Sequence, residues 1–150
     1  MKEVKGDFWE MASAFNVICV TTNSVVKDDL QLVMGGGIAR QFAERYPQLP
    51  RILGHHVKKA GNTPRLVQLV GQPFILSMPT KDDWKNPSPM PLVARSAATI
   101  VELVNKFDLG PVLSVRPGCG LGGLRWGQVK PVLENAGWDD RFTIVSPGVF

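Results

Sequence analysis

The amino-acid sequence predicts an α/β fold, a three-layer α/β/α sandwich around a mixed sheet of about six strands. Short runs rich in β-branched residues alternate along the chain with longer stretches whose apolar residues have helical spacing. Glycine and proline, which account for 15 and 12 of the 150 residues, separate many of these runs. Strands that alternate with helices form a largely parallel sheet that is covered on both faces.

Five short apolar runs, each flanked by Gly, Pro or Asn, have the composition of buried strands. They are Asn16–Thr21, Leu66–Val70, Phe74–Met78, Val112–Val115 and Phe142–Val145. We expect a sixth strand, Lys2–Lys5, at an edge of the sheet. Because Gly71-Gln72-Pro73 separates the second run from the third, these two runs predict an antiparallel hairpin, which makes the sheet mixed.

Four stretches have the length and spacing of helices, and a further helix is expected to begin near Phe8. They are Gly37–Tyr46, Pro50–Lys59, Pro91–Phe107 and Trp126–Ala136. In the third, apolar residues recur on one face: Val93, Ala97, Ile100, Val101 and Val104.

Length and composition favour one globular domain, residues 1–150. We expect this protein in the cytoplasm, since its two cysteines suit a reducing compartment, and as a monomer. Charged residues near the start, such as Glu3 and Asp7, argue against a signal peptide, and no apolar run approaches the ~18 residues of a membrane span. Cys19 and Cys119 form no metal-binding pattern, so no metal is expected. The net charge of +4 suits a phosphate-bearing ligand but does not establish one.

The stretch Arg116–Trp126 (RPGCGLGGLRW) contains a GxGxxG pattern between an expected strand and an expected helix. In a dinucleotide-binding fold, further βα units follow, and the next strand ends in an acid that holds the ribose. Here the next strand runs into Ser146–Phe150, where the sequence stops. The dinucleotide-binding interpretation is therefore disfavoured.

A second glycine run, Met34–Ala39 (MGGGIA), also opens a helix. Two such loops at the same edge of a sheet present backbone N–H groups that can hold a diphosphate from both sides. Glycine suits this task because a Cβ would keep the phosphate oxygens away from the backbone. The alternative is that both loops are tight strand-to-helix turns without a ligand.

These residues resemble the macrodomains, a family whose ligand is ADP-ribose. The resemblance covers nearly the whole chain and is most specific in Pro79–Trp84 (PTKDDW) and Gly118–Trp126 (GCGLGGLRW). Within the family it points to the branch of the DarG antitoxin macrodomain and the terminal ADP-ribose protein glycohydrolase. The resemblance implies a macrodomain fold and ADP-ribose as ligand or substrate moiety, with no separate cofactor.

The resemblance also implies individual binding roles. Asp7 matches the acid that accepts a hydrogen bond from adenine, while its alternative role is the N-cap of the helix near Phe8. Asn23 matches the asparagine that contacts the distal ribose, and its alternative is a turn residue. The expected ligand-binding residues are Asp7, Phe8, Asn23, Gly35, Gly36, Gly37, Ile38, Thr80, Trp84, Gly118, Cys119, Gly120, Leu121, Gly122, Gly123 and Leu124.

Lys81 stands where this branch carries its catalytic lysine, which implies action at the anomeric carbon of the distal ribose. The amine would act as nucleophile or would polarise the bond between the ribose and its target. A nucleophilic lysine must lose its proton, so Asp82 and Asp83 would oppose this role if they faced it. The alternative is a solvated lysine in a loop.

Two departures from the family patterns narrow the expected substrate. The protein glycohydrolase has an aspartate in its second glycine loop where this chain has Gly122, as the antitoxin branch does. Another hydrolase branch has an aspartate where this chain has Ala39. The resemblance therefore implies release of ADP-ribose from DNA rather than from protein. The alternatives are a non-catalytic ADP-ribose reader and an ADP-ribose 1″-phosphate phosphatase.

The Asn23–Gly35 segment is longer than expected for this branch.

Overall fold

The computed structural model describes residues 1–147, so the end of the Ser146–Phe150 segment lies outside the described residues. One sheet contains six strands in the order β1-β6-β5-β2-β4-β3, and five helices accompany it. In chain order the elements are β1 (Lys2–Lys5), α1 (Phe8–Ala12), β2 (Val17–Thr22), α2 (Gly37–Arg45), α3 (Leu49–Ala60), β3 (Leu66–Val67), β4 (Phe74–Pro79), α4 (Met90–Phe107), β5 (Val112–Ser114), α5 (Trp126–Ala136) and β6 (Phe142–Ser146).

The sheet is mixed, as the sequence predicts. Strands β1, β6, β5, β2 and β4 run parallel to their neighbours, and β3 alone pairs antiparallel, with β4. Strand β1 lies at an edge, also as predicted. The predicted strand Leu66–Val70 is wrong in length, because only Leu66 and Val67 pair with β4. Val70 is fully exposed beside the turn at Gly71, where no neighbouring strand remains to pair with it.

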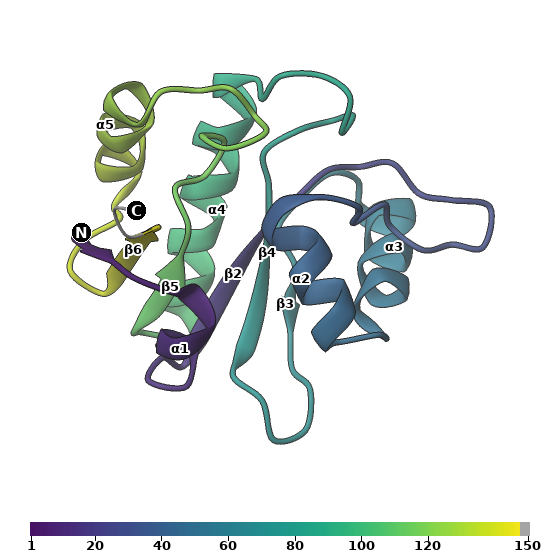
Figure 1. Ribbon diagram of the computed structural model, residues 1–150, viewed down its shortest axis with the longest axis horizontal. Helices are drawn as coiled ribbons and strands as arrows, with labels where there is room; N and C mark the ends of the chain where they lie inside the picture. Colours follow the sequence, from purple (N-terminus) through teal and green to yellow (C-terminus); the bar gives the residue numbers. More distant parts are fainter. Residues whose placement is uncertain (148–150) are drawn as a thin grey trace.

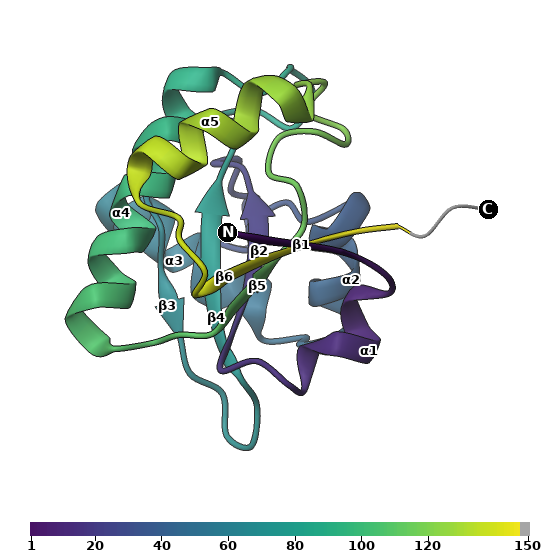
Figure 2. The ribbon, with the colours of Figure 1, turned by 90° about the vertical axis from the view of Figure 1, so that its left-hand side faces the viewer.

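The helices form the two outer layers. Helices α4 and α5 cover one face of the sheet, and α1, α2 and α3 cover the other (Figures 1 and 2). Strand β2 contributes to both cores, because successive side chains of a strand point to opposite faces. Val17 and Cys19 pack under α4, whereas Ile18 and Val20 pack under the other helices. Burial of each such side chain stabilises the fold by about 1.5–3 kcal/mol.

Parallel pairing brings the carboxyl ends of five strands to one edge of the sheet. The segments that leave this edge contain Asp7 after β1, Asn23 after β2, Thr80 after β4 and Arg116 after β5. In α/β sheets such an edge is where ligands usually bind. The topology therefore gathers most of the residues that the sequence singles out.

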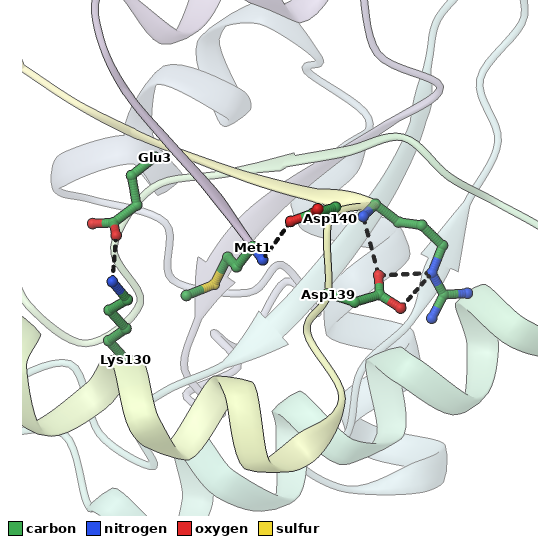
Figure 3. A network of polar contacts seen from close by, with 6 residues as sticks. Met1, Glu3, Lys130, Asp139 and Asp140 are labelled. Carbon is green, nitrogen blue, oxygen red and sulfur yellow. Dashed lines mark hydrogen bonds and ion pairs between the residues drawn. The ribbon is translucent and has the colours of Figure 1, made fainter.

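Ion pairs connect the start of the chain and the edge strand β1 to the α5–β6 loop and to α5 (Figure 3). The terminal amine of Met1 forms an ion pair with Asp140 at 3.0 Å, and Glu3 forms one with Lys130 at 2.7 Å. The indole N–H of Trp126 donates to the other oxygen of Glu3 at 2.8 Å. Because Trp126 opens α5, these contacts hold the helix that follows the second glycine stretch.

Candidate functional site

The two glycine loops meet across the carboxyl edge of the sheet. A Cβ added to Gly36 would lie 3.1 Å from Cδ1 of Leu121, and one added to Gly37 would lie 3.7 Å from it. Leu121 is the tip of the second loop and is 74% exposed, so only its side-chain end touches the first loop. The loops therefore face one another, with backbone groups of both available to one ligand.

The first glycine loop leads directly into α2. Gly36 is the N-cap residue, no side chain caps this helix, and Gly37 begins it with a φ of +55°. A residue with a Cβ is strained in that conformation. Ile38 packs against the core beneath, whereas Gly35 and Gly37 are exposed. The uncapped N–H groups at this terminus can bind an anion.

The second glycine loop is held in shape by its own backbone and by Ser88. The N–H of Leu124 donates to the carbonyl of Gly118 at 2.9 Å, and the N–H of Ser88 donates to the carbonyl of Gly122 at 3.0 Å. A Cβ on Gly122 would lie 2.3 Å from Oγ of Ser88 and 2.5 Å from the carbonyl oxygen of Gly118. Only glycine fits at position 122.

Ser88 is a residue that the sequence analysis missed. It is 5% exposed, and its Oγ has no hydrogen-bond partner among the described residues. It lies in the proline-rich stretch that leads into α4, where nothing in the local sequence distinguishes it from a loop serine. Its role comes from a long-range contact with the second glycine loop.

Lys81 joins this edge to the second glycine loop. Its backbone N–H donates to the carbonyl of Thr22 at 3.3 Å, which continues the pairing of β4 with β2. Its Nζ donates to the carbonyl oxygens of Trp84 at 3.2 Å and of Leu121 at 3.1 Å. The lysine is half-buried. The structure therefore does not support the alternative of a freely solvated loop lysine.

The carboxylates beside Lys81 are bound by other groups. Asp82 accepts a hydrogen bond from Nδ2 of Asn62 at 3.0 Å, and Asp83 accepts one from the N–H of Lys85 at 2.9 Å. Among residues 1–147, no ion pair links either carboxylate to Lys81. Asn62, a second residue that the sequence analysis missed, also donates to the carbonyl of Lys81 at 2.9 Å.

Asp7 caps α1, which is the alternative role that the sequence left open for it. Its Oδ1 accepts from the N–H groups of Trp9 at 2.7 Å and Glu10 at 3.3 Å. The carboxylate is exposed, so its second oxygen remains accessible. Phe8 is 7% exposed and its ring centroid lies 5.7 Å from that of Phe42, so its side chain belongs to the core.

Asn23 holds the long segment between β2 and the first glycine loop. Its Nδ2 donates to the carbonyl of Val33 and its Oδ1 accepts from the N–H of Val25, both at 2.9 Å. The segment packs so closely on α3 that a Cβ on Gly54 would lie 1.9 Å from the carbonyl oxygen of Leu30. The turn role of Asn23 is thus present in the structure.

The remaining predicted contacts differ in exposure. Thr80 is 4% exposed and its N–H donates to the carbonyl of Thr22 at 3.0 Å, whereas Trp84 is 49% exposed. Cys119 is half-buried, and burial raises the pKa of its thiol. This environment fits packing rather than a reactive thiol. Gly120 and Gly123 are exposed on the second loop.

The surface has two hollows, of which one adjoins the first glycine loop and the other lies away from both loops. One of about 380 Å³ lies between the Asn23–Gly35 segment and α2, and Met34, Gly35 and Arg40 contribute to its lining. A larger one, of about 570 Å³, is lined by residues of the β3–β4 turn and the end of α2. The larger hollow is remote from the carboxyl edge, so size alone does not locate the candidate site.

Neither a metal centre nor a transmembrane helix is found in the part of the chain that the structure describes. Residues 1–147 contain no group of three or more His, Cys, Asp or Glu side chains placed to hold a metal ion. None of the helices in this range has the length and apolar character needed to cross a membrane.

No protein-family model matches the chain, but curated proteins do. It is 30% identical over 110 residues to the DNA ADP-ribosyl glycohydrolase of Mycobacterium tuberculosis, a match that covers 69% of this chain and 31% of that protein. It is 27% identical over 151 residues to a DNA ADP-ribosyl transferase-DNA ADP-ribosyl glycohydrolase fusion protein of Thermosipho africanus, covering 87% and 37% respectively. The chain spans about a third of the length of these relatives.

Solved structures match over nearly the whole chain. The macrodomain of Mycobacterium tuberculosis DarG superimposes with a TM-score of 0.82 at 26% identity, covering 98% of this chain and 97% of that one. Thermosipho africanus DarTG in complex with ADP-ribose gives a TM-score of 0.80 at 25% identity, covering 97% and 42%. These matches confirm the predicted three-layer α/β/α fold.

Proposed function

The chain belongs to the macrodomain family, and from that membership we propose that it binds ADP-ribose and hydrolyses it from ADP-ribosylated DNA. The observation that carries the proposal is the contact of Lys81 with the second glycine loop. Its Nζ donates to the carbonyl of Leu121, and the side chain of Leu121 reaches the first glycine loop. The amine of Lys81 therefore adjoins the two loops that would hold the diphosphate.

ADP-ribose is expected to lie along the carboxyl edge of the sheet. The diphosphate is bound by backbone N–H groups of Gly35–Ile38 and by those N–H groups of Gly118–Leu124 that the hydrogen bonds within the second loop leave free. The free carboxylate oxygen of Asp7 accepts from the adenine amino group. Asn23 and Thr80 line the distal ribose through atoms that their structural hydrogen bonds leave unused, and Trp84 forms an exposed wall of the pocket.

Lys81 acts at the anomeric carbon of the distal ribose. As a neutral amine it donates both protons to the carbonyls of Trp84 and Leu121, which leaves its lone pair free to attack. The new C–N bond replaces the bond between the ribose and the target, and the departing target takes the proton that the amine gives up. Water then adds to the anomeric carbon, its proton returns to the Lys81 amine as the C–N bond breaks, and ADP-ribose is released. As an ammonium group it keeps one further N–H, which polarises the bond to the target instead.

DNA is the favoured target because of Gly122. The aspartate that completes the mechanism in the protein glycohydrolase has no space there, since its Cβ would collide with Ser88 and Gly118. The names of the curated relatives, DNA ADP-ribosyl glycohydrolases, support the same target. The proposal further includes a cytoplasmic, monomeric protein whose residues 1–150 form one domain and whose chemistry needs neither metal nor a separate cofactor.

The first test joins calorimetric titration with ADP-ribose to an assay of ADP-ribose release. The substrate is single-stranded DNA modified by a DNA ADP-ribosyl transferase, and the proteins are the wild type and Lys81→Ala. We expect micromolar binding by both proteins and release only by the wild type. Binding without release by the wild type would identify a reader, and absence of binding would overturn the role of both loops. Release of phosphate from ADP-ribose 1″-phosphate, assayed in parallel, tests the phosphatase alternative.

A further inference from the structure

The positive charge of the protein is concentrated in one segment. Residues 45–81 contain no Asp or Glu, and they carry six cationic side chains. Their formal charge is +6, whereas the whole chain carries +4, so the remaining residues together carry −2. The six cations are Arg45, Arg51, Lys58, Lys59, Arg65 and Lys81. Such asymmetry along a chain is typical of a surface that meets a polyanion.

Within this segment the cations line the outer face of α3. Arg51, Lys58 and Lys59 are all exposed, and Lys58 and Lys59 follow Arg51 after about two helical turns, on the same side of the helix. The opposite face of the helix, which includes Leu49 and Leu53, is buried in the core. These side chains carry the same charge, so they form no ion pairs with one another that would stabilise the helix.

Three of these cations have no counter-charge of their own. Among residues 1–147, no ion pair includes Lys58, Lys59 or Arg65. Arg45 instead stacks over Trp9 at 4.1 Å, and the negative charge of Asp29 lies near Arg51. The first three are therefore free to bind an external anion.

The segment that carries these three cations reaches the candidate site. The backbone of Arg65 is paired with Ser77 in β4, through bonds of 2.8 Å and 3.0 Å, close to the carboxyl end of that strand. Asn62, between Lys59 and Arg65 in the chain, donates to the carbonyl of Lys81 at 2.9 Å. The end of α3 and the loop after it thus reach the segment that carries the proposed catalytic amine.

The helix dipole explains only part of this pattern. Cations in the last turn of a helix, such as Lys58 and Lys59, are stabilised by the carbonyl end of the dipole. Arg65 lies beyond the helix, and the dipole does not account for the absence of acids over the whole segment. Asp82 is the exposed acid at the junction with the site, and Asn62 binds one of its oxygens.

We propose that Lys58, Lys59 and Arg65 bind the phosphate backbone of the DNA strand that carries the ADP-ribosyl group. This surface rests on the proposed function, because it supplies the DNA contacts that pocket residues specific for ADP-ribose do not make. Backbone contacts are independent of sequence and position the strand. The strand would pass from the end of α3 over the loop at Asn62 to the pocket beside Lys81.

The test compares two triple variants of equal charge change. One carries Lys58→Gln, Lys59→Gln and Arg65→Gln; the control carries Lys2→Gln, Arg95→Gln and Lys106→Gln, exposed cations on β1 and α4. Binding of an unmodified single strand of about 16 nucleotides is measured over a range of salt concentrations. Each phosphate contact contributes about 0.7 to the slope of log affinity against log salt concentration for a single strand.

We expect the first variant to lose about 2 from that slope and at least tenfold in affinity at low salt, while the control matches the wild type. Equal losses in both variants, or none in the first, would overturn the proposal. Stronger binding to anionic lipid vesicles than to DNA would overturn it too. Release from substrates of about 16 nucleotides should fall, with little change for substrates of about 4.

Failure of the surface and failure of the proposed function are distinguishable. ADP-ribose affinity, measured by calorimetry, should be equal in the wild type and in both variants. If the wild type binds unmodified DNA with the expected slope but does not bind ADP-ribose, the surface holds and the proposed function fails. If it binds ADP-ribose and both variants bind DNA as the wild type does, the surface alone is wrong.

Discussion

The side-chain amine of Lys81 donates to the carbonyl oxygen of Leu121 at 3.1 Å, across 40 positions of the sequence. The same amine donates to Trp84 in its own segment, so it ties the end of β4 to the second glycine loop. A residue expected to perform chemistry is thereby also a support for the loop that would hold the diphosphate. Catalytic and structural effects of its substitution have to be separated by experiment.

Lys81→Met should separate these effects, because it keeps most of the side-chain stem and removes the amine. We expect release of ADP-ribose from DNA to fall by about 10²–10⁴-fold, the range for loss of a group that transfers or holds a proton. The free energy of unfolding should fall by only about 1 kcal/mol, since the two hydrogen bonds are partly exposed. Lys85→Met, at the exposed lysine nearby, is the control and should retain full release. A similar drop in both variants would remove Lys81 from the chemistry.

Gly122→Ala should damage the second glycine loop. Its Cβ would approach Ser88 Oγ and the Gly118 carbonyl far more closely than van der Waals contact allows. We expect the free energy of unfolding to fall by about 1–3 kcal/mol or more, together with ADP-ribose affinity. Gly120→Ala is the matched control, because a Cβ there meets nothing within 4 Å, and its unfolding should stay within about 0.5 kcal/mol of the wild type. Thermal denaturation of both variants decides whether the packing is as tight as described.

Much of the fold follows from local patterns in the sequence. Trp126–Ala136 is a helix with the predicted bounds, and the antiparallel pairing of Leu66 with β4 is also as predicted. Apolar periodicity and glycine placement suffice for such elements because each is decided by a few neighbouring residues. The short length of β3 was not predictable, since it depends on where its partner strand turns away.

The candidate site is predictable only where a motif carries it. Both glycine loops and Lys81 stand out in the sequence, and parallel pairing brings them to one edge. Ser88 and Asn62 do not stand out, because their contacts join segments far apart in the chain. The sequence leaves two roles open for Asn23, a contact with the distal ribose and a turn. The structure shows the turn role, in which its amide binds the backbone of Val25 and Val33.

Asn23→Asp should weaken the segment between β2 and the first glycine loop. The substitution keeps the side-chain oxygen that accepts a hydrogen bond from the N–H of Val25, and it removes the N–H that donates to the carbonyl of Val33. That carbonyl loses its partner and faces the new carboxylate. Because Asn23 is 8% exposed, we expect a loss of about 1–3 kcal/mol in the free energy of unfolding. Chemical denaturation measures this loss. Unchanged stability combined with weaker ADP-ribose binding would instead assign Asn23 to the ligand alone.

Both cysteines should react slowly with alkylating reagents in the folded protein. Burial raises the pKa of Cys19 to about 12 and that of Cys119 above its ordinary value, so little thiolate exists at neutral pH. Mass spectrometry after timed treatment with iodoacetamide should find both thiols largely unmodified at pH 7, and Cys119 modified first as the pH rises. Unfolding in guanidinium provides the control, in which both react quickly. Rapid modification of Cys119 at pH 7 would contradict the packing role of its side chain.

Glu3→Gln should lower stability in a manner that depends on pH. The hydrogen bond from Lys130, with that from Trp126, holds the pKa of Glu3 below its ordinary value. A lowered pKa in the folded state stabilises the protein above the ordinary pKa of glutamate, and this contribution disappears as the pH falls through the folded-state pKa. We therefore expect the variant to have a lower Tm than the wild type at pH 7, and a smaller difference in Tm at about pH 3, below the ordinary pKa of glutamate.

The size of this effect should be small, because the Glu3 and Lys130 side chains are both partly exposed. Salt provides the control, since an exposed ion pair is screened and the difference in Tm at pH 7 should shrink as sodium chloride is added. The indole N–H of Trp126 can also donate to the neutral amide oxygen of the glutamine, so this hydrogen bond should contribute little to the difference in Tm. A difference that is the same at both pH values would show that Glu3 acts through packing of β1 alone.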